Sequence, residues 1–301
     1  MAKPKLEQPT CVVFVGGPDT GKTNYLVRLF VGLTEKTGVL IAPELPPQIA
    51  YLEAGRKHLA QGRFVPRSGA EKLGDLFARV EFSAGRRAGE SALVQVPDVM
   101  GELWKDAVDN REIDPAWLKR VRNSTGALLF VRPSSHENVD FLDWVTAADW
   151  MNLEPGDGAP EKTLPSQVIA TELLTLLEDE LGSAVPGAKP RVAIIATSWD
   201  AVPPDRRDRA PYEFLNAEFP MFAGRILDTE RLEVMVFGCS VVGGDLQDDA
   251  DFRIAYRDME IETAGYVVVG REDGSASQLR DVTLPLAWSL GAELPGDGAG
   301  G

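Results

Sequence analysis

The chain has 301 residues, enough for one large domain or two small ones with a well-buried core. Its composition, 44% hydrophobic and 26% charged, is that of an ordinary soluble globular protein. A net charge of −15 repels phosphate backbones and anionic lipid, and no apolar stretch approaches the length of a membrane span. We therefore expect a cytoplasmic protein that binds no nucleic acid and inserts no segment into a membrane.

The first strand is predicted at Cys11–Val15, a short apolar run typical of a fully buried strand. A glycine-rich loop follows at once. A helix is predicted next, over residues 24–33, because its apolar side chains fall on one face. The order strand, loop, helix is the context that a phosphate-binding loop requires.

The loop Gly16-Gly17-Pro18-Asp19-Thr20-Gly21-Lys22-Thr23 matches the Walker A pattern. Its glycines let backbone N–H groups surround phosphate oxygens, and the helix behind it adds its positive N-terminal end. Lys22 would reach the β- and γ-phosphates, and the Thr23 hydroxyl would ligate Mg²⁺. A chance match has a probability of about 1% in a chain of this length. The residues expected to bind nucleotide here are Gly16, Asp19, Thr20, Gly21, Lys22, Thr23 and Asn24.

Apolar β-runs alternate with helical segments along the remaining chain. Strands are predicted at 76–82, 91–96, 127–131, 192–196 and 234–238, and helices at 48–61 and 166–181. The first two of these strands flank a turn and form a hairpin. The alternation predicts an α/β P-loop NTPase fold: a mostly parallel, doubly wound sheet with one antiparallel edge hairpin and helices on both faces.

One P-loop domain is expected over residues 11–291, between a flexible arm at 1–10 and a glycine-rich disordered tail at 292–301. Insertions into this domain are expected near 35–70, 150–165 and 250–282. The last insertion contains Tyr266–Gly270 followed by Asp273-Gly274, which indicates a small hairpin near the surface.

Asp98-Val99-Met100-Gly101 directly follows the second hairpin strand. An aspartate there can hold Mg²⁺ through water, and Gly101 can turn its N–H toward the γ-phosphate of a nucleotide. Asp98 and Thr23 are therefore expected to place Mg²⁺ beside the phosphate loop.

Thr197-Ser198-Trp199-Asp200 follows the buried strand at 192–196. The Asp200 carboxylate can accept hydrogen bonds from N1–H and N2–H₂ of guanine, a donor pair that adenine lacks. Its alternative role is to cap the next helix. Ser240 follows the last strand of the series, where the backbone could support the guanine O6.

These four motifs, in this order, resemble those of Ras-like P-loop GTPases over about residues 11–245. Val12–Leu33 is especially similar to the Arf and signal-recognition-particle-receptor β-subunit branch. A longer pattern resembles the double-GTPase families of bacterial conflict systems, and it consists of Leu59-x-x-Gly62-x-x-x-Pro66-x-Ser68, Asp98-x-x-Gly101-Glu102 and Val282–Trp288. The resemblance implies a molecular switch that binds GTP and GDP with Mg²⁺ and is encoded beside protein partners in a bacterial defence or signalling system.

The chain departs from the GTPase pattern at two positions that bear on affinity and hydrolysis. Ser198 stands where these GTPases carry a lysine whose aliphatic stem covers the guanine face. Glu102 stands where they carry a water-positioning glutamine, and the γ-phosphate repels a carboxylate unless it acts as a base or pairs with a cation. Slow hydrolysis is therefore expected, with Lys22, Gly101 and Glu102 as the catalytic residues. Ser68 best matches the switch residue that adds to the Mg²⁺ ligands, and Thr37 is the second candidate.

Three functions remain open. The first is a switch GTPase whose loops at 35–70 and 98–111 change order with the γ-phosphate and whose partner is a protein effector. The second is an ATP-dependent P-loop ATPase or kinase, in which Asp200 is only structural. The third is a nucleotide-bound adaptor that does not hydrolyse, which the carboxylate of Glu102 favours.

Overall fold

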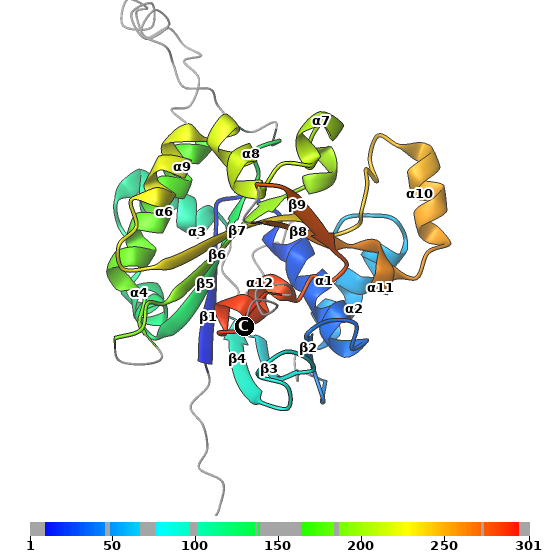
Figure 1. Cartoon of the computed structure of the whole chain (residues 1–301), viewed down its shortest axis with the longest axis horizontal. Coiled ribbons are helices and arrows are strands. Elements are labelled where there is room, and N and C mark those ends of the chain that lie inside the picture. The colour runs from blue at the N-terminus through cyan, green and yellow to red at the C-terminus, as the bar shows by residue number, and fades with distance from the viewer. Residues whose placement is uncertain are drawn as a thin grey trace, which may run out of the picture.

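The computed structural model describes residues 10–45, 49–66, 76–96, 101–135, 138, 164–183, 187–271 and 274–294. Within these ranges the strands form one nine-stranded sheet in the order β2-β3-β4-β1-β5-β6-β7-β8-β9, with helices on both faces (Figure 1). The predicted α/β fold class is therefore confirmed. Among the described residues, no helix combines the length and apolarity needed to cross a membrane.

The elements follow the predicted alternation closely. The strands are β1 (Thr10–Val15), β2 (Leu40–Ile41), β3 (Leu76–Phe82), β4 (Ser91–Val96), β5 (Ser124–Val131), β6 (Arg191–Thr197), β7 (Glu233–Ser240), β8 (Tyr266–Gly270) and β9 (Ala276–Leu279). The helices are α1 (Lys22–Thr34), α2 (Ile49–Ala60), α3 (Gly101–Asn110), α4 (Pro115–Arg122), α6 (Ser166–Glu180), the 3₁₀ turn η1 (Trp199–Ala201), α7 (Pro204–Arg207), α8 (Pro211–Glu218), α9 (Pro220–Leu227), α10 (Ala250–Arg257), α11 (Ile261–Ala264) and α12 (Leu284–Ser289).

The central strands β4, β1, β5, β6 and β7 are parallel. Their apolar runs are covered on both faces, and the side chains of Val12–Val15 are at most 4% exposed. Since the carboxyl ends of parallel strands meet at one edge of a sheet, the loops after β1, β5, β6 and β7 lie side by side. At this edge therefore lie the Walker A loop, the segment that begins at Arg132, the turn that contains Asp200, and Ser240 at the end of β7.

Both outer edges of the sheet are antiparallel, whereas the sequence predicts only one antiparallel edge. The predicted hairpin is β3 and β4, which β2 extends. At the other edge β8 pairs with β7, and β9 pairs with β8. The hairpin expected near the surface at 265–282 thus begins with a strand of the central sheet, because Tyr266–Val269 is apolar on both faces and buried.

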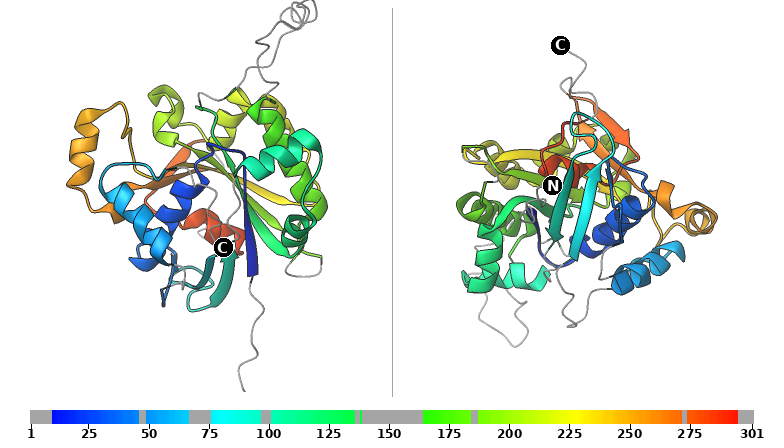
Figure 2. Two further views of the ribbon diagram at one scale, coloured as in Figure 1. Left: turned by 180° about the vertical axis from the view of Figure 1, so that it is seen from behind. Right: turned by 90° about the horizontal axis from the view of Figure 1, so that it is seen from below.

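Helices lie on both sides of the sheet (Figure 2), and the sheet separates two hydrophobic cores that these helices cover. One lies beneath α1, α2 and α12, and the other beneath α3, α4, α6, α8 and α9. Residues 250–264 also pack onto the first side, where the buried guanidinium of Arg28 in α1 donates to the backbone oxygen of Glu262 at 2.6 Å.

The closing segment Val282–Trp288 anchors the helix that carries the Walker A lysine. The Tyr25 hydroxyl of α1 donates to the backbone oxygen of Val282 at 3.0 Å. The Leu40 N–H of β2 donates to the Thr283 hydroxyl at 3.2 Å. Trp288 packs edge-to-face on Phe237 of β7, with ring centroids 6.0 Å apart. These contacts give the terminal motif a structural role, which is to fix α1 against the sheet.

Candidate functional site

The Walker A loop connects β1 to α1 and bends through three residues with positive φ. These residues are Gly16 (φ +150°), Asp19 (φ +56°) and Gly21 (φ +82°). A Cβ atom at Gly16 would lie 2.7 Å from the backbone oxygen of Phe130 in β5, so a larger residue there would push the two strand ends apart. Gly21 adopts the left-handed region at the N-terminus of α1, which suits glycine best.

Lys22 lies across this loop and contacts its carbonyl oxygens. Its Nζ atom is 2.7 Å from the backbone oxygens of both Gly16 and Gly17 and 3.3 Å from Thr20 Oγ1. The Thr20 hydroxyl in turn donates to Gly17 O at 2.8 Å. The ammonium group is therefore held at the loop, where it can also donate to phosphate oxygens.

Thr23 and Asn24 follow Lys22 in the first turn of α1. Asn24 Oδ1 accepts a hydrogen bond from the Val65 N–H at 2.9 Å, so it contacts the segment that leads toward Ser68. Asp98 and Ser68, the other predicted Mg²⁺ ligands, lie outside the described residues. Among the residues that the structure describes, no group of three or more histidine, cysteine or acidic side chains could hold a metal ion.

The predicted catalytic residues other than Lys22 lie at the start of α3. Gly101 and Glu102 form the first two positions of that helix, which begins at the last residue of the motif at 98–101. Their side-chain placement is outside the described part of the structure. The roles assigned to them stay predictions.

Thr197 connects the end of β6 to the phosphate loop. Its Oγ1 lies 3.0 Å from the backbone oxygen of Thr20 and 3.2 Å from that of Val131, within donating distance of both. The side chain is almost fully buried. Thr197 thus connects the end of β6 with the phosphate loop and with the end of β5, three segments that are far apart in sequence.

Asp200 lies in the turn η1 after Ser198, which has a positive φ of 54°. Burial raises the pKa of the Asp200 carboxyl. A hydrogen bond from the Ser240 hydroxyl, the backbone N–H of Asp200 itself and the charge of Arg207 each lower this pKa and so oppose the effect of burial. Arg207 also donates to the backbone oxygen of Asp200. Asp200 is therefore held by contacts from a neighbouring strand and helix, the first at its carboxylate and the second at its backbone oxygen.

Ser240, the last residue of β7, supports the same carboxylate. Its side chain is fully buried, and Oγ accepts a hydrogen bond from the Gly243 N–H at 2.8 Å. The sequence suggests only a backbone role for Ser240, whereas the structure adds this side-chain bond to Asp200. Asp200 and Ser240 thus form one polar edge, which we call the base edge because the sequence predicts that Asp200 binds guanine.

Trp199 does not replace the missing lysine stem of the GTPase pattern. Its ring is 1% exposed and packs edge-to-face against Phe214, with centroids 5.2 Å apart. A Cβ at Gly238 would lie 2.4 Å from this ring, so the indole fills the core beside β7. A base bound at Asp200 would therefore lack an aromatic partner from Trp199.

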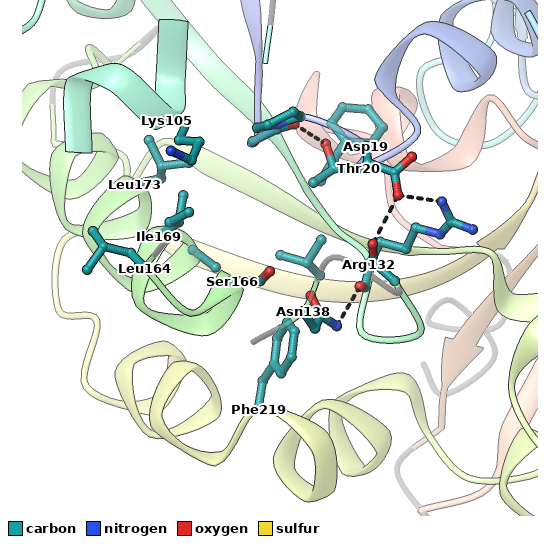
Figure 3. Close-up of a pocket in the computed structure, with 16 residues that line it drawn as sticks. Asp19, Thr20, Lys105, Arg132, Asn138, Leu164, Ser166, Ile169, Leu173 and Phe219 are labelled. Carbon is teal, nitrogen blue, oxygen red and sulfur yellow. Dashed lines mark hydrogen bonds and ion pairs between the residues drawn. The ribbon is translucent and has the colours of Figure 1, made fainter. Parts of the chain in front are cut away.

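The structure also brings Arg132 and Ser135 to the phosphate loop, which sequence reasoning missed. Arg132 Nη1 lies 2.8 Å and Ser135 Oγ 3.0 Å from Asp19 Oδ2, at the rim of a pocket between the loop, β5 and α6 (Figure 3). A cation directly after β5 is the signal that could have indicated this contact, because β5 is parallel to β1.

Comparisons with known proteins identify the family. A family model described as Double-GTPase 1 matches residues 13–289. No curated protein matches. The chain is also similar to a solved structure, the signal recognition particle receptor SRb-GTP/SRX complex from Chaetomium thermophilum, at 12% identity, with 83% of this chain and 98% of that chain covered and a TM-score of 0.40. The family match spans the Walker A loop, the base edge and the closing helix, and the chain therefore belongs to the Double-GTPase 1 family of GTP-binding P-loop proteins.

Proposed function

We propose that this protein hydrolyses GTP slowly with Mg²⁺ and acts as a molecular switch for a protein partner. The observation that carries the proposal is the Thr197 contact, 3.0 Å from the Thr20 backbone oxygen, which joins the phosphate loop to the turn of Asp200. A ligand held by Lys22 at one end and Asp200 at the other would span one connected site. Guanine offers the donor pair that a fixed carboxylate can accept.

Mg²⁺ suits the oxygen donors of the three residues that the motifs assign to it. Thr23, Asp98 and Ser68 are the residues proposed to hold the ion, and hydroxyl and carboxylate oxygens are the ligand types that Mg²⁺ prefers. When bound, the ion would neutralise charge on the β- and γ-phosphates. Lys22 would donate to the same phosphates, and Gly101 would offer its N–H to the γ-phosphate.

The switch role rests on the segments that flank the phosphate loop. Asn24 holds Val65, three residues before Ser68, and α3 begins at Gly101 beside the predicted γ-phosphate contact. Loops at 35–70 and 98–111 could therefore respond to the γ-phosphate. A role in a bacterial conflict system, with a protein effector in the cytoplasm, follows from the resemblance of the motifs to such double GTPases.

The test begins with the nucleotide that the protein carries. The protein is purified gently, denatured, and the released nucleotide is identified by chromatography. Guanine nucleotide is expected, together with Mg²⁺-dependent release of phosphate from GTP at about 10⁻³ per second or slower without a partner. Adenine nucleotide, or turnover of ATP in preference to GTP, would replace the proposal with the ATPase or kinase alternative.

Glu102→Gln separates a slow switch from an adaptor that does not hydrolyse. If Glu102 only repels the γ-phosphate, the amide variant hydrolyses GTP faster than wild type, because the like charge is gone. If Glu102 is a catalytic base, the variant loses activity and the slow-switch explanation is wrong. Absence of GTP turnover in both proteins, with guanine nucleotide bound, would favour the adaptor.

A further inference from the structure

Asp19 places a carboxylate inside the loop that is proposed to bind phosphates. The residue adopts φ +56°, a left-handed conformation that aspartate tolerates better than most residues. Its neighbours Thr20 and Gly21 carry backbone amides of the predicted phosphate cradle. A carboxylate this close would repel a nucleoside triphosphate, because screening at physiological salt acts over about 8 Å.

The segment after β5 supplies a cation to this carboxylate. Arg132 Nη1 lies 2.8 Å from Asp19 Oδ2, and the Ser135 hydroxyl donates to the same oxygen at 3.0 Å. The side chains of Arg132 and Asp19 are 29% and 30% exposed, so the pair is partly withdrawn from water and is screened less than a surface ion pair.

The Arg132 segment is itself held in a compact turn. The Ser135 N–H donates to the backbone oxygen of Arg132 at 3.1 Å, and Asn138 Nδ2 donates to the same oxygen at 3.2 Å. The parallel pairing of β1 and β5 brings this turn next to the Walker A loop. Figure 3 shows the Asp19 carboxylate turned toward Arg132 and the end of β5.

We propose that Arg132 is a positioning residue for the phosphate loop. It neutralises Asp19 and holds the carboxylate toward the end of β5, which keeps the loop amides available to an anionic ligand. The inference rests on the proposed function, because the ligand is the triphosphate of GTP. The inference gives residues outside the Walker A motif a part in phosphate affinity. Within the motif, Asp19 anchors the loop and does not bind phosphate.

A double-mutant cycle tests the proposal with fluorescent GTP and GDP. Arg132→Gln is expected to weaken GTP binding about tenfold and GDP binding less, since GDP carries less charge to be repelled by an Asp19 that has lost the arginine charge. Asp19→Asn removes the repulsion, so the double variant Asp19→Asn/Arg132→Gln is expected to bind GTP within about twofold of Asp19→Asn. High salt should reduce the loss of GTP affinity that Arg132→Gln causes, because it screens the repulsion between Asp19 and the phosphates.

Two controls separate this role from a structural or direct one. Arg122→Gln breaks the ion pair with Glu180 at the far end of α6 and should not alter GTP binding. Arg132→Lys keeps the charge and should bind GTP within about threefold of wild type. A tenfold loss in folded Arg132→Lys would contradict the role as countercharge.

The cycle also distinguishes the alternatives. If Arg132→Gln weakens GTP binding by the same factor in wild-type protein and in Asp19→Asn, Arg132 acts on the nucleotide directly and the proposal is overturned. If Arg132→Gln costs nothing, the ion pair has no part in binding and the proposal is again overturned. Wild-type protein that binds no guanine nucleotide overturns the proposed function itself, and this inference with it.

Discussion

Within the phosphate loop, Lys22 contacts carbonyl oxygens at most six residues away, whereas at the base edge Asp200, in the turn after β6, is paired with Ser240 at the end of β7. The centre of the loop is thus a local structure built from backbone groups and one cation, to which Thr197 and Arg132 add contacts from distant segments. The base edge exists only after β6 and β7 have paired. If the proposed function holds, we expect the loop to supply affinity through charge and the base edge to supply selectivity through fixed geometry.

Lys22→Ala should produce the largest effect, because it removes the cation on which the loop's affinity for phosphate depends. Charge-assisted hydrogen bonds contribute about 1.5–3 kcal/mol each, so loss of contacts to two phosphates should weaken GTP binding by about 100-fold or more. The measurement is titration with fluorescent GTP.

The matched control for the lysine is Lys57→Ala, which removes the same charge from an exposed position of α2. It should leave GTP binding as in wild type, and both variants should unfold near the wild-type temperature. Tight GTP binding by a folded Lys22→Ala variant would remove the phosphate role from the loop and break the comparison.

Asp200→Asn should weaken GTP binding by about 10- to 100-fold, since a buried donor left unpaired costs about 1–3 kcal/mol. The preference should shift toward xanthosine triphosphate, whose C2 carbonyl accepts the new amide N–H. Competition of GTP, ATP and XTP in fluorescent-nucleotide displacement measures both changes.

Asp205→Asn in α7 is the control, because its carboxylate is exposed and should not affect selectivity. Equal binding of ATP and GTP by wild type, unchanged in Asp200→Asn, would mean that the edge does not read the base. Selectivity would then have to come from elsewhere in the molecule.

The same contrast explains how much the sequence could predict. The Walker A loop, with the strand before it and the helix after it, could be located from the sequence because its conformation is set locally by Gly16, Gly21 and Lys22, and its binding residues stay predictions. The hairpin β3–β4 was predicted with its correct bounds, since its turn and alternation are local too. The bond from Ser240 to Asp200 and the pairing of Arg132 with Asp19 were not predictable, because they join residues at or after the ends of different strands and depend on how those strands pair.

The second antiparallel edge was missed for a related reason. Tyr266–Val269 is apolar throughout, which indicates a buried strand, but a nearby turn at 273–274 also suits a surface hairpin. Only the pairing of β8 with β7 decides between the two. The residues of the switch segments, Ser68 and Asp98, lie outside the described structure, so their roles rest on the motifs alone.

Thr197→Val tests the connection between the two regions. Valine keeps the shape but loses the hydroxyl near Thr20 O and Val131 O, so GTP and GDP should both bind more weakly by up to about tenfold. An equal effect on the two nucleotides is expected, because the hydroxyl positions the loop and touches no γ-phosphate.

The matched control is Thr171→Val in α6, where the hydroxyl donates to its own helix at Gln167 O at 2.7 Å. It makes the same chemical change and should leave nucleotide affinity as in wild type. Equal losses in the Thr171 and Thr197 variants would show a general effect on stability in place of a specific connection.

The smallest effect concerns pH, and it acts on the base edge alone. Burial raises the pKa of Asp200, and the charge of Asp245 raises it further. The Ser240 hydrogen bond, the residue's own backbone N–H and the charge of Arg207 lower this pKa in part. Guanine needs the ionised carboxylate, so protons and GTP compete. GTP affinity should therefore begin to fall at a higher pH than the usual aspartate pKa of about 3.9 would give.

Stability of the free protein should change in the opposite direction. A carboxyl whose pKa is higher in the folded than in the unfolded state binds its proton more tightly when folded, so its protonation stabilises the fold. As pH rises through the interval between the unfolded and folded pKa values, this stabilisation is lost. Asp200→Asn removes the titration, so its unfolding temperature relative to that of wild type should be higher above the folded pKa of Asp200 than below the usual aspartate pKa of about 3.9. The same variant should show a flatter pH profile for nucleotide binding over this range. A wild-type profile as flat as that of Asp200→Asn would mean that Asp200 does not contact the base in its ionised form, and selectivity would no longer separate the base edge from the phosphate loop.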